Sequence, residues 1–117
     1  MKLVVYLVVG IFILLDIITG LIKALYQGNM DSTILRKGLF HKLSEAIATG
    51  CAGLFEYLAN YFEFGFELPL VKVVAGYICL MEFMSVCENL AEVNPALRKL
   101  FEPYLGKLKG GKDEDGD

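Results

Sequence analysis

The chain has 117 residues, the length of one domain, and 56% of them are apolar. Its mean hydropathy is +0.53, and an apolar content above the roughly 45 to 50% of soluble domains excludes an intrinsically disordered chain. Eleven basic and 14 acidic residues give a net charge of −3, without the basic excess of a nucleic-acid-binding protein. We therefore expect no nucleic-acid partner.

The first apolar block runs from Leu3 to Ile22 and contains Asp16 as its one charged residue. About 20 helical residues cross the roughly 30 Å of hydrocarbon in a bilayer, so this block predicts a membrane span over about residues 3–24. A secretory signal peptide is the alternative, because Lys2 precedes the apolar run. We disfavour it because no small-x-small cleavage site follows the run.

A basic loop follows, with Arg36, Lys37 and Lys42 between residues 27 and 43. Asp31 or Ser32 can cap a short amphipathic helix over residues 33–42, whose apolar side chains could lie on the inner leaflet. Because positively charged loops stay in the cytoplasm, we place this loop inside the cell.

The second block, residues 45–64, is less apolar but ordered. Its polar and small residues recur at spacings of 4, 3, 4, 4 and 3, which puts them on one face of a helix. They are Glu45, Thr49, Ala52, Glu56, Asn60 and Glu63. We predict a second span with one face turned away from lipid. An interfacial amphipathic helix is the alternative, although such helices usually carry Lys and Arg on the polar face.

The third block, residues 68–88, has Lys72 near its start and Glu82 deep inside. The link between the second and third blocks, Gly65 to Pro69, is short and carries no Lys or Arg. The two blocks therefore predict a helical hairpin whose turn lies outside the cell.

Together these elements predict an all-α membrane protein with three transmembrane helices, spanning residues 3–24, 45–64 and 68–88 within a membrane domain of residues 1–94. The amino terminus is expected outside and the carboxyl terminus in the cytoplasm. The charged tail, residues 95–117, should begin as a basic helix and become disordered after Gly110 and Gly111, where acidic residues follow.

Three acids, Asp16, Glu56 and Glu82, fall within about 8 Å of the membrane centre by helical rise, with no cation expected at their depth. Two interpretations remain open. Each acid is protonated or hydrogen-bonded in a static helix bundle, or the acids and Asn60 line water or trigger opening when many copies assemble. Small residues favour close helix packing. The candidates are Gly20, Ala46, Gly50, Gly53 and Gly76.

Catalytic motifs are missing from the sequence. His41 is the one histidine, and the three cysteines have neither the Cys-x-x-Cys spacing of a zinc site nor the number for a full disulfide framework. We therefore expect no enzyme activity and no cofactor.

Two segments resemble the phage holin family, which includes toxin-secretion and phage-lysis holins. The first is the run Asp16, Thr19, Gly20, Lys23 and Ala24, continued by Ser32, Lys37, Gly38, Leu39 and Lys42. The second follows Glu82 at the exit of the last span and contains the junction Ser85, Glu88 and Asn89. The resemblance covers residues 10–108.

The resemblance implies a small protein that accumulates and oligomerises in the bacterial cytoplasmic membrane. There it would open lesions that release a cell-wall hydrolase, its functional partner, or a toxin. A small transporter or regulatory subunit whose acids bind a proton or cation is the alternative. A soluble helical bundle is a third interpretation, which the apolar blocks disfavour.

Overall fold

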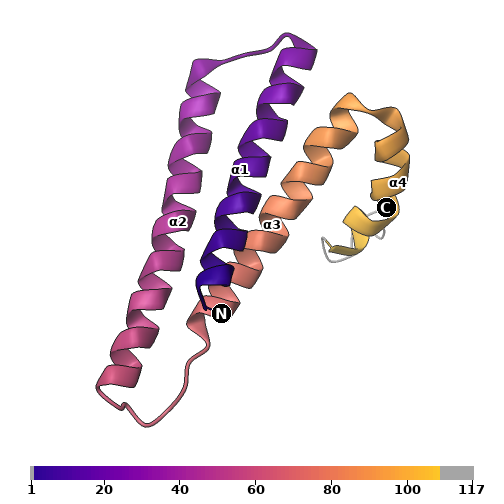
Figure 1. Ribbon diagram of the computed structural model, residues 1–117. Coiled ribbons are helices and arrows are strands. Elements are labelled where there is room, and N and C mark those ends of the chain that lie inside the picture. Colours follow the sequence, from indigo (N-terminus) through magenta and orange to yellow (C-terminus); the bar gives the residue numbers. More distant parts are fainter. Residues whose placement is uncertain (1, 109–117) are drawn as a thin grey trace.

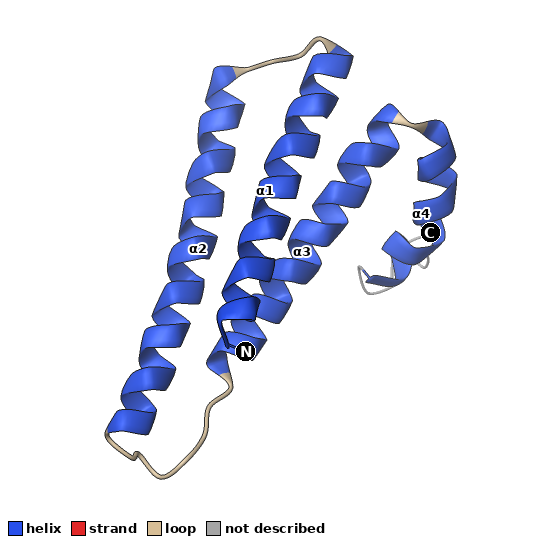
Figure 2. Cartoon of the chain, in the orientation of Figure 1, coloured by secondary structure: helices blue, strands red, loops and turns tan. Residues whose placement is uncertain are grey.

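The computed structural model describes residues 2–108, and within them the chain forms four helices (Figure 1). These are α1 (Lys2–Gln27), α2 (Ser32–Tyr61), α3 (Leu70–Val93) and α4 (Pro95–Leu108). Short loops connect the helices, and no strand occurs in the described part of the chain (Figure 2). The all-α fold predicted from the sequence is therefore confirmed.

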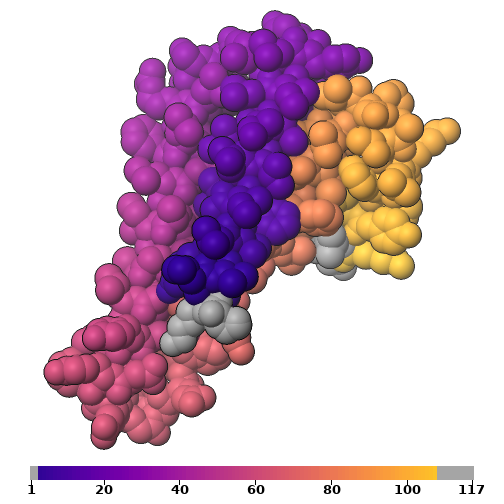
Figure 3. All heavy atoms as spheres, viewed as in Figure 1, coloured from indigo at the N-terminus to yellow at the C-terminus, as the bar shows by residue number. Residues whose placement is uncertain are grey.

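Helices α1 and α3 lie side by side and run in the same direction. Near their amino-terminal ends Val9 of α1 packs against Ala75 and Ile78 of α3, and at the other end Gln27 Nε2 donates a hydrogen bond to Glu92 Oε1 at 3.2 Å. Helix α2 runs antiparallel to both, and α4 folds back beside α3 (Figure 1). The last turn of α2 and the loop after it project past the start of α1 (Figure 3).

Large apolar side chains cover the outside of this bundle. On α1, Leu3 is 71% exposed, Leu7 61% and Leu14 55%. Soluble proteins rarely expose contiguous apolar surface on this scale. The buried cluster, by contrast, is small and centres on Val9, Ala75 and Ile78. This distribution suits a helix bundle that is surrounded by lipid.

Among residues 2–108, two helices, not three, are long and apolar enough by themselves to cross a membrane: Leu3–Gln27 and Leu70–Val93. They match the first and third predicted spans. Only 17% of the apolar window in α1 and 33% of that in α3 is buried, so neither is the enclosed core helix of a soluble protein.

The predicted second span, residues 45–64, does not meet this criterion, so composition supports two of the three predicted transmembrane helices. Glu45, Glu56 and Asn60 lower its hydropathy below that of a self-sufficient span. The segment is also not a separate helix, because it forms the second half of the 30-residue α2.

The short loop helix predicted over residues 33–42 is likewise not separate, because it forms the first half of α2. Asp31 caps the helix as predicted, accepting a hydrogen bond from the Thr33 amide at 2.9 Å. Between the two predicted segments Ser44 donates its hydroxyl to the His41 carbonyl at 2.7 Å and leaves the helical backbone intact. The helix therefore continues through the expected boundary.

The loop between α2 and α3 covers residues 62–69 and turns at Gly65, whose φ of 88° favours glycine. Pro69 precedes α3 and offers no side-chain cap. Glu56, on the neighbouring helix, fills this role by accepting a hydrogen bond from the Val71 amide at 2.7 Å. The predicted hairpin is thus present, with a longer connection than expected.

The first part of the tail is helical, as predicted. Asn94 accepts hydrogen bonds from the Ala96 and Leu97 amides and so caps α4, and Pro95 occupies a position where its missing amide hydrogen has no cost. The disorder predicted after Gly110 lies outside the described residues.

Candidate functional site

A buried polar cluster lies halfway along the bundle, where α1, α2 and α3 meet. Lys42 Nζ lies 2.5 Å from Asp16 Oδ2 and 3.1 Å from Glu82 Oε1, so that one lysine of α2 bridges acids from the other two helices. Asp16 is 8% exposed and Glu82 2%. We call Asp16, Lys42 and Glu82 the clasp.

The sequence predicts Lys42 in a loop outside the spans and no cation level with the acids. Both predictions are wrong, for one reason. Because α2 is continuous from Ser32, Lys42 lies ten residues, or about 15 Å, along the helix, level with Asp16 and Glu82.

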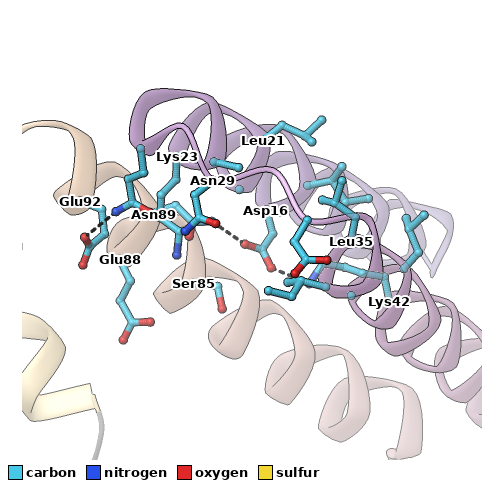
Figure 4. A pocket seen from close by; sticks show the side chains of 18 residues that line it. Asp16, Leu21, Lys23, Asn29, Leu35, Lys42, Ser85, Glu88, Asn89 and Glu92 are labelled. Carbon is cyan, nitrogen blue, oxygen red and sulfur yellow. Dashed lines mark hydrogen bonds and ion pairs between the residues drawn. The ribbon is translucent and has the colours of Figure 1, made fainter.

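Asn89 and Thr19 form a hydrogen-bond network beside Asp16. Asn89 Nδ2 of α3 donates to Asp16 Oδ1 and to Thr19 Oγ1, both at 3.0 Å. The Thr19 hydroxyl donates in turn to the Leu15 carbonyl at 2.9 Å. Both carboxylate oxygens of Asp16 therefore have partners (Figure 4), as a buried charge requires.

The clasp has more acids than bases. Glu45, one turn after Lys42, is close to His41, with Nδ1 and Oε2 3.7 Å apart. The buried atoms Glu45 Oε1 and Glu82 Oε1 accept no hydrogen bond, although Glu82 Oε1 has the ion pair with Lys42. The ion pairs with Lys42 compensate part of the desolvation cost of Asp16 and Glu82, and Glu45 adds a further acid beside them.

A divalent metal ion would find suitable donor types here, because ligand atoms of His41, Glu45 and Glu82 lie within 4.8 Å of one another. Lys42, however, already places a positive charge against Glu82, and the His41 side chain is 68% exposed. We therefore interpret the cluster as a network of ion pairs between side chains and not as a metal site.

An open pocket of about 890 Å³ lies beside the clasp, between α1, the first half of α2 and the second half of α3 (Figure 4). Residues from both segments of the family resemblance converge on it, although they are far apart in the sequence. They are Asp16, Gly20, Lys23, Ala24, Gly38, Leu39, Lys42, Ser85, Glu88 and Asn89.

The other candidate residues lie elsewhere. Glu56 caps α3 and lines a second pocket of about 300 Å³ together with the exposed Asn60. Asp16 and Glu82 are thus brought together, whereas Glu56 lies near the far end of the bundle.

The small residues divide into two groups. Gly20 faces Asn89 and Gly53 faces the Tyr6 hydroxyl group, so both allow contacts within one chain. Ala46, Gly50 and Gly76 are exposed, with open space around Gly50 and Gly76.

Sequence reasoning named Lys42 in the basic loop and in the family resemblance but missed its pairing with the acids, although a signal for it existed. The polar stripe that starts at Glu45 extends backwards by one further helical step of three residues to Lys42. The polar stripe was not extended to Lys42 because a boundary was assumed between the loop helix, residues 33–42, and the span, residues 45–64. Thr19, which bonds to Asn89, offered no comparable periodic signal.

A family model described as the bacteriophage holin family matches residues 1–110 of the chain, and the chain belongs to this family. The resemblance found in the sequence is thereby confirmed. No curated protein and no solved structure matches the chain.

Removing the lysine of the clasp should destabilise the bundle. Lys42→Met leaves Asp16 and Glu82 together without a cation, and breaking a buried pair in this way costs about 3 to 5 kcal/mol. Thermal unfolding in detergent micelles, followed by circular dichroism, measures the effect. The matched control is Lys37→Met at an exposed position of the same helix, expected within about 0.5 kcal/mol of the unsubstituted chain.

A triple variant with Asp16→Asn, Lys42→Met and Glu82→Gln should recover much of the lost stability, because no charge is then left unpaired at the clasp. Equal unfolding temperatures for Lys42→Met and Lys37→Met would contradict a stabilising role of the clasp.

Proposed function

We propose that this holin-family protein oligomerises in the bacterial cytoplasmic membrane and forms lesions through which a cell-wall hydrolase or a toxin leaves the cytoplasm. Membership of the bacteriophage holin family is the observation on which this rests. The exposed apolar surfaces of α1 and α3 support residence in a bilayer. A peptidoglycan hydrolase is the functional partner, and the holin itself acts without catalysis.

The direction of the helices supports three passes through the membrane. Since α1 and α3 are parallel neighbours, a chain that crosses with α1 must return before it can cross again with α3. Helix α2 follows the whole length of both. We propose that it crosses with them although its composition alone would not suffice, because Lys42, Glu45 and Glu56 turn toward its partners.

The distribution of basic residues supports an external amino terminus. Arg36 and Lys37 lie in the first turns of α2, and Arg98 and Lys99 in the first turns of α4, at the same end of the bundle (Figure 1). The loop of residues 62–69 at the opposite end has no Lys or Arg. The positive-inside rule then places the loop between α1 and α2 and the start of α4 in the cytoplasm.

Cysteine labelling tests this topology. In a variant without the three native cysteines, Glu67→Cys should react with a membrane-impermeant thiol reagent in cells with an intact inner membrane. Asn29→Cys should react only after the cells are opened, because it lies in the opposite loop. Labelling of Asn29→Cys but not Glu67→Cys in intact cells would show that the orientation is reversed.

Expression of this chain alone should make the cytoplasmic membrane leaky to a small dye, measured by fluorescence at matched protein levels. Gly50→Leu should delay the leakage and reduce chemically crosslinked oligomers, because a bulky side chain on this exposed face holds neighbouring copies apart. An intact membrane at high levels of inserted protein would contradict the proposal.

The alternative is a small transporter or regulatory subunit whose buried acids bind a proton or cation. The grouping of Glu45 and Glu82 near His41 is the observation that favours it. The leakage experiment separates the two, since a regulatory subunit depends on a larger partner and does not permeabilise a membrane alone.

A further inference from the structure

The two acids of the clasp offer little surface to water in the folded bundle, because Asp16 borders the open pocket but is only 8% exposed and Glu82 is 2% exposed. Asp16 and Glu82 are buried against Lys42 and Asn89, and their polar atoms point into the chain. A lesion lined by many copies needs a polar surface that is exposed on each copy. That surface has to be sought on the outside of the bundle.

The outer faces of α1 and α3 are unsuitable because they are apolar. On α1 the exposed side chains at membrane depth include Leu7, Ile11 and Leu14, each more than half exposed. On α3, Val73 is 62% exposed and Phe83 42%. Side chains of this kind favour hydrocarbon over water.

Helix α2 has an exposed strip of a different character. Its residues are spaced by 4, 4, 3, 4 and 3, so they follow one line along the helix, and every one of them is exposed. We call it the α2 strip, and it consists of Thr33, Lys37, His41, Ser44, Ala48 and Cys51. It contains no large aliphatic or aromatic side chain.

The clasp fixes the depth of this strip. Because Lys42 is level with Asp16, Ser44 is level with Leu14, about 2 Å from the centre of the apolar block of α1, and His41 lies about 7 Å from that centre. The Ser44 hydroxyl is already bonded to the His41 carbonyl, but the His41 imidazole is 68% exposed, and an exposed imidazole at this depth is costly to place against lipid tails. Water facing the strip would solvate this imidazole.

We propose that the α2 strip lines the aqueous lumen of the lesion, while the apolar faces of α1 and α3 remain toward lipid. This inference rests on the proposed function and identifies the surface that performs it. The strip continues from the cytoplasmic edge of the bundle at Thr33 to Cys51, beyond the midplane, and Phe55 ends it near the outer edge. The lumen then admits polar solutes past Lys37, His41 and Ser44 without the clasp having to open.

Thiol labelling at matched depths tests the proposal, since a charged methanethiosulfonate reacts with thiolates that water can reach. One pair compares Ser44→Cys with Leu14→Cys in chains without native cysteines. The second compares native Cys51, with Cys79 and Cys87 replaced by alanine, with Leu7→Cys in a cysteine-free chain. Each variant is expressed until dye leakage begins, and its labelling is measured before and after that point.

After leakage begins, the two α2 positions should react at least about tenfold faster than the α1 positions at the same depth, because water favours the reactive thiolate. Before leakage all four should react slowly. Equal rates at matched depths in leaking cells, or disulfide-linked dimers through Ser44→Cys in place of labelling, would overturn the assignment of the lumen while leaving the lesion-forming function intact. If neither the variants nor the unsubstituted chain made the membrane leak, the result would instead count against the proposed function itself.

Discussion

The ion pair between one lysine and two acids is the constraint on which the rest of this structure depends. Lys42 reaches Asp16 and Glu82 at 2.5 and 3.1 Å, and each of the three side chains comes from a different helix. Burial of any one of these charges alone would cost several kcal/mol, so each helix is held at the register in which the charges meet. That register places the first half of α2 alongside the apolar parts of α1 and α3.

The bundle therefore has a polar cluster inside, beside a small apolar core, and large apolar side chains outside. Asp16, Glu82 and Asn89 are buried, whereas leucines and isoleucines of α1 are exposed. In water such an arrangement would lose the hydrophobic contribution to stability, but in a bilayer the lipid tails solvate the outer face. Hydrogen bonds and ion pairs between helices then take over the role that an apolar core has in a soluble protein. The expectation of a static bundle with satisfied acids is thus compatible with assembly through other surfaces.

Much of the fold could be predicted from the sequence because the helical period is visible in it. The apolar runs beginning at Leu3 and Leu68 led to α1 and α3, and Asp31 marked the start of α2. What failed was the division of α2 into a loop helix and a separate span. Charge density suggested a boundary near Lys42, yet no Gly or Pro interrupts the chain at that point, and tertiary pairing determined where the lysine lies.

The site could be predicted only in part for the same reason. Asp16 and Glu82 were identified because a charge inside an apolar run is conspicuous, but their common partner came from a segment assigned to the cytoplasm. Glu56 was identified correctly as unusual, while its hydrogen bond to the Val71 amide depends on the turn between α2 and α3. Single residues were therefore recognisable from the sequence, and the contacts between them required the packing.

Distance measurement in a bilayer tests the clasp most directly. Solid-state nuclear magnetic resonance on protein labelled with ¹⁵N at lysine and ¹³C at the aspartate and glutamate carboxyl groups reports which carboxyls lie beside each ammonium. The account predicts a strong dipolar contact from Lys42 Nζ to the carboxyl carbons of Asp16 and Glu82, lost in Lys42→Met. A Lys42 signal coupled to lipid phosphate, with no contact to either acid while α1 and α3 are inserted, would contradict it.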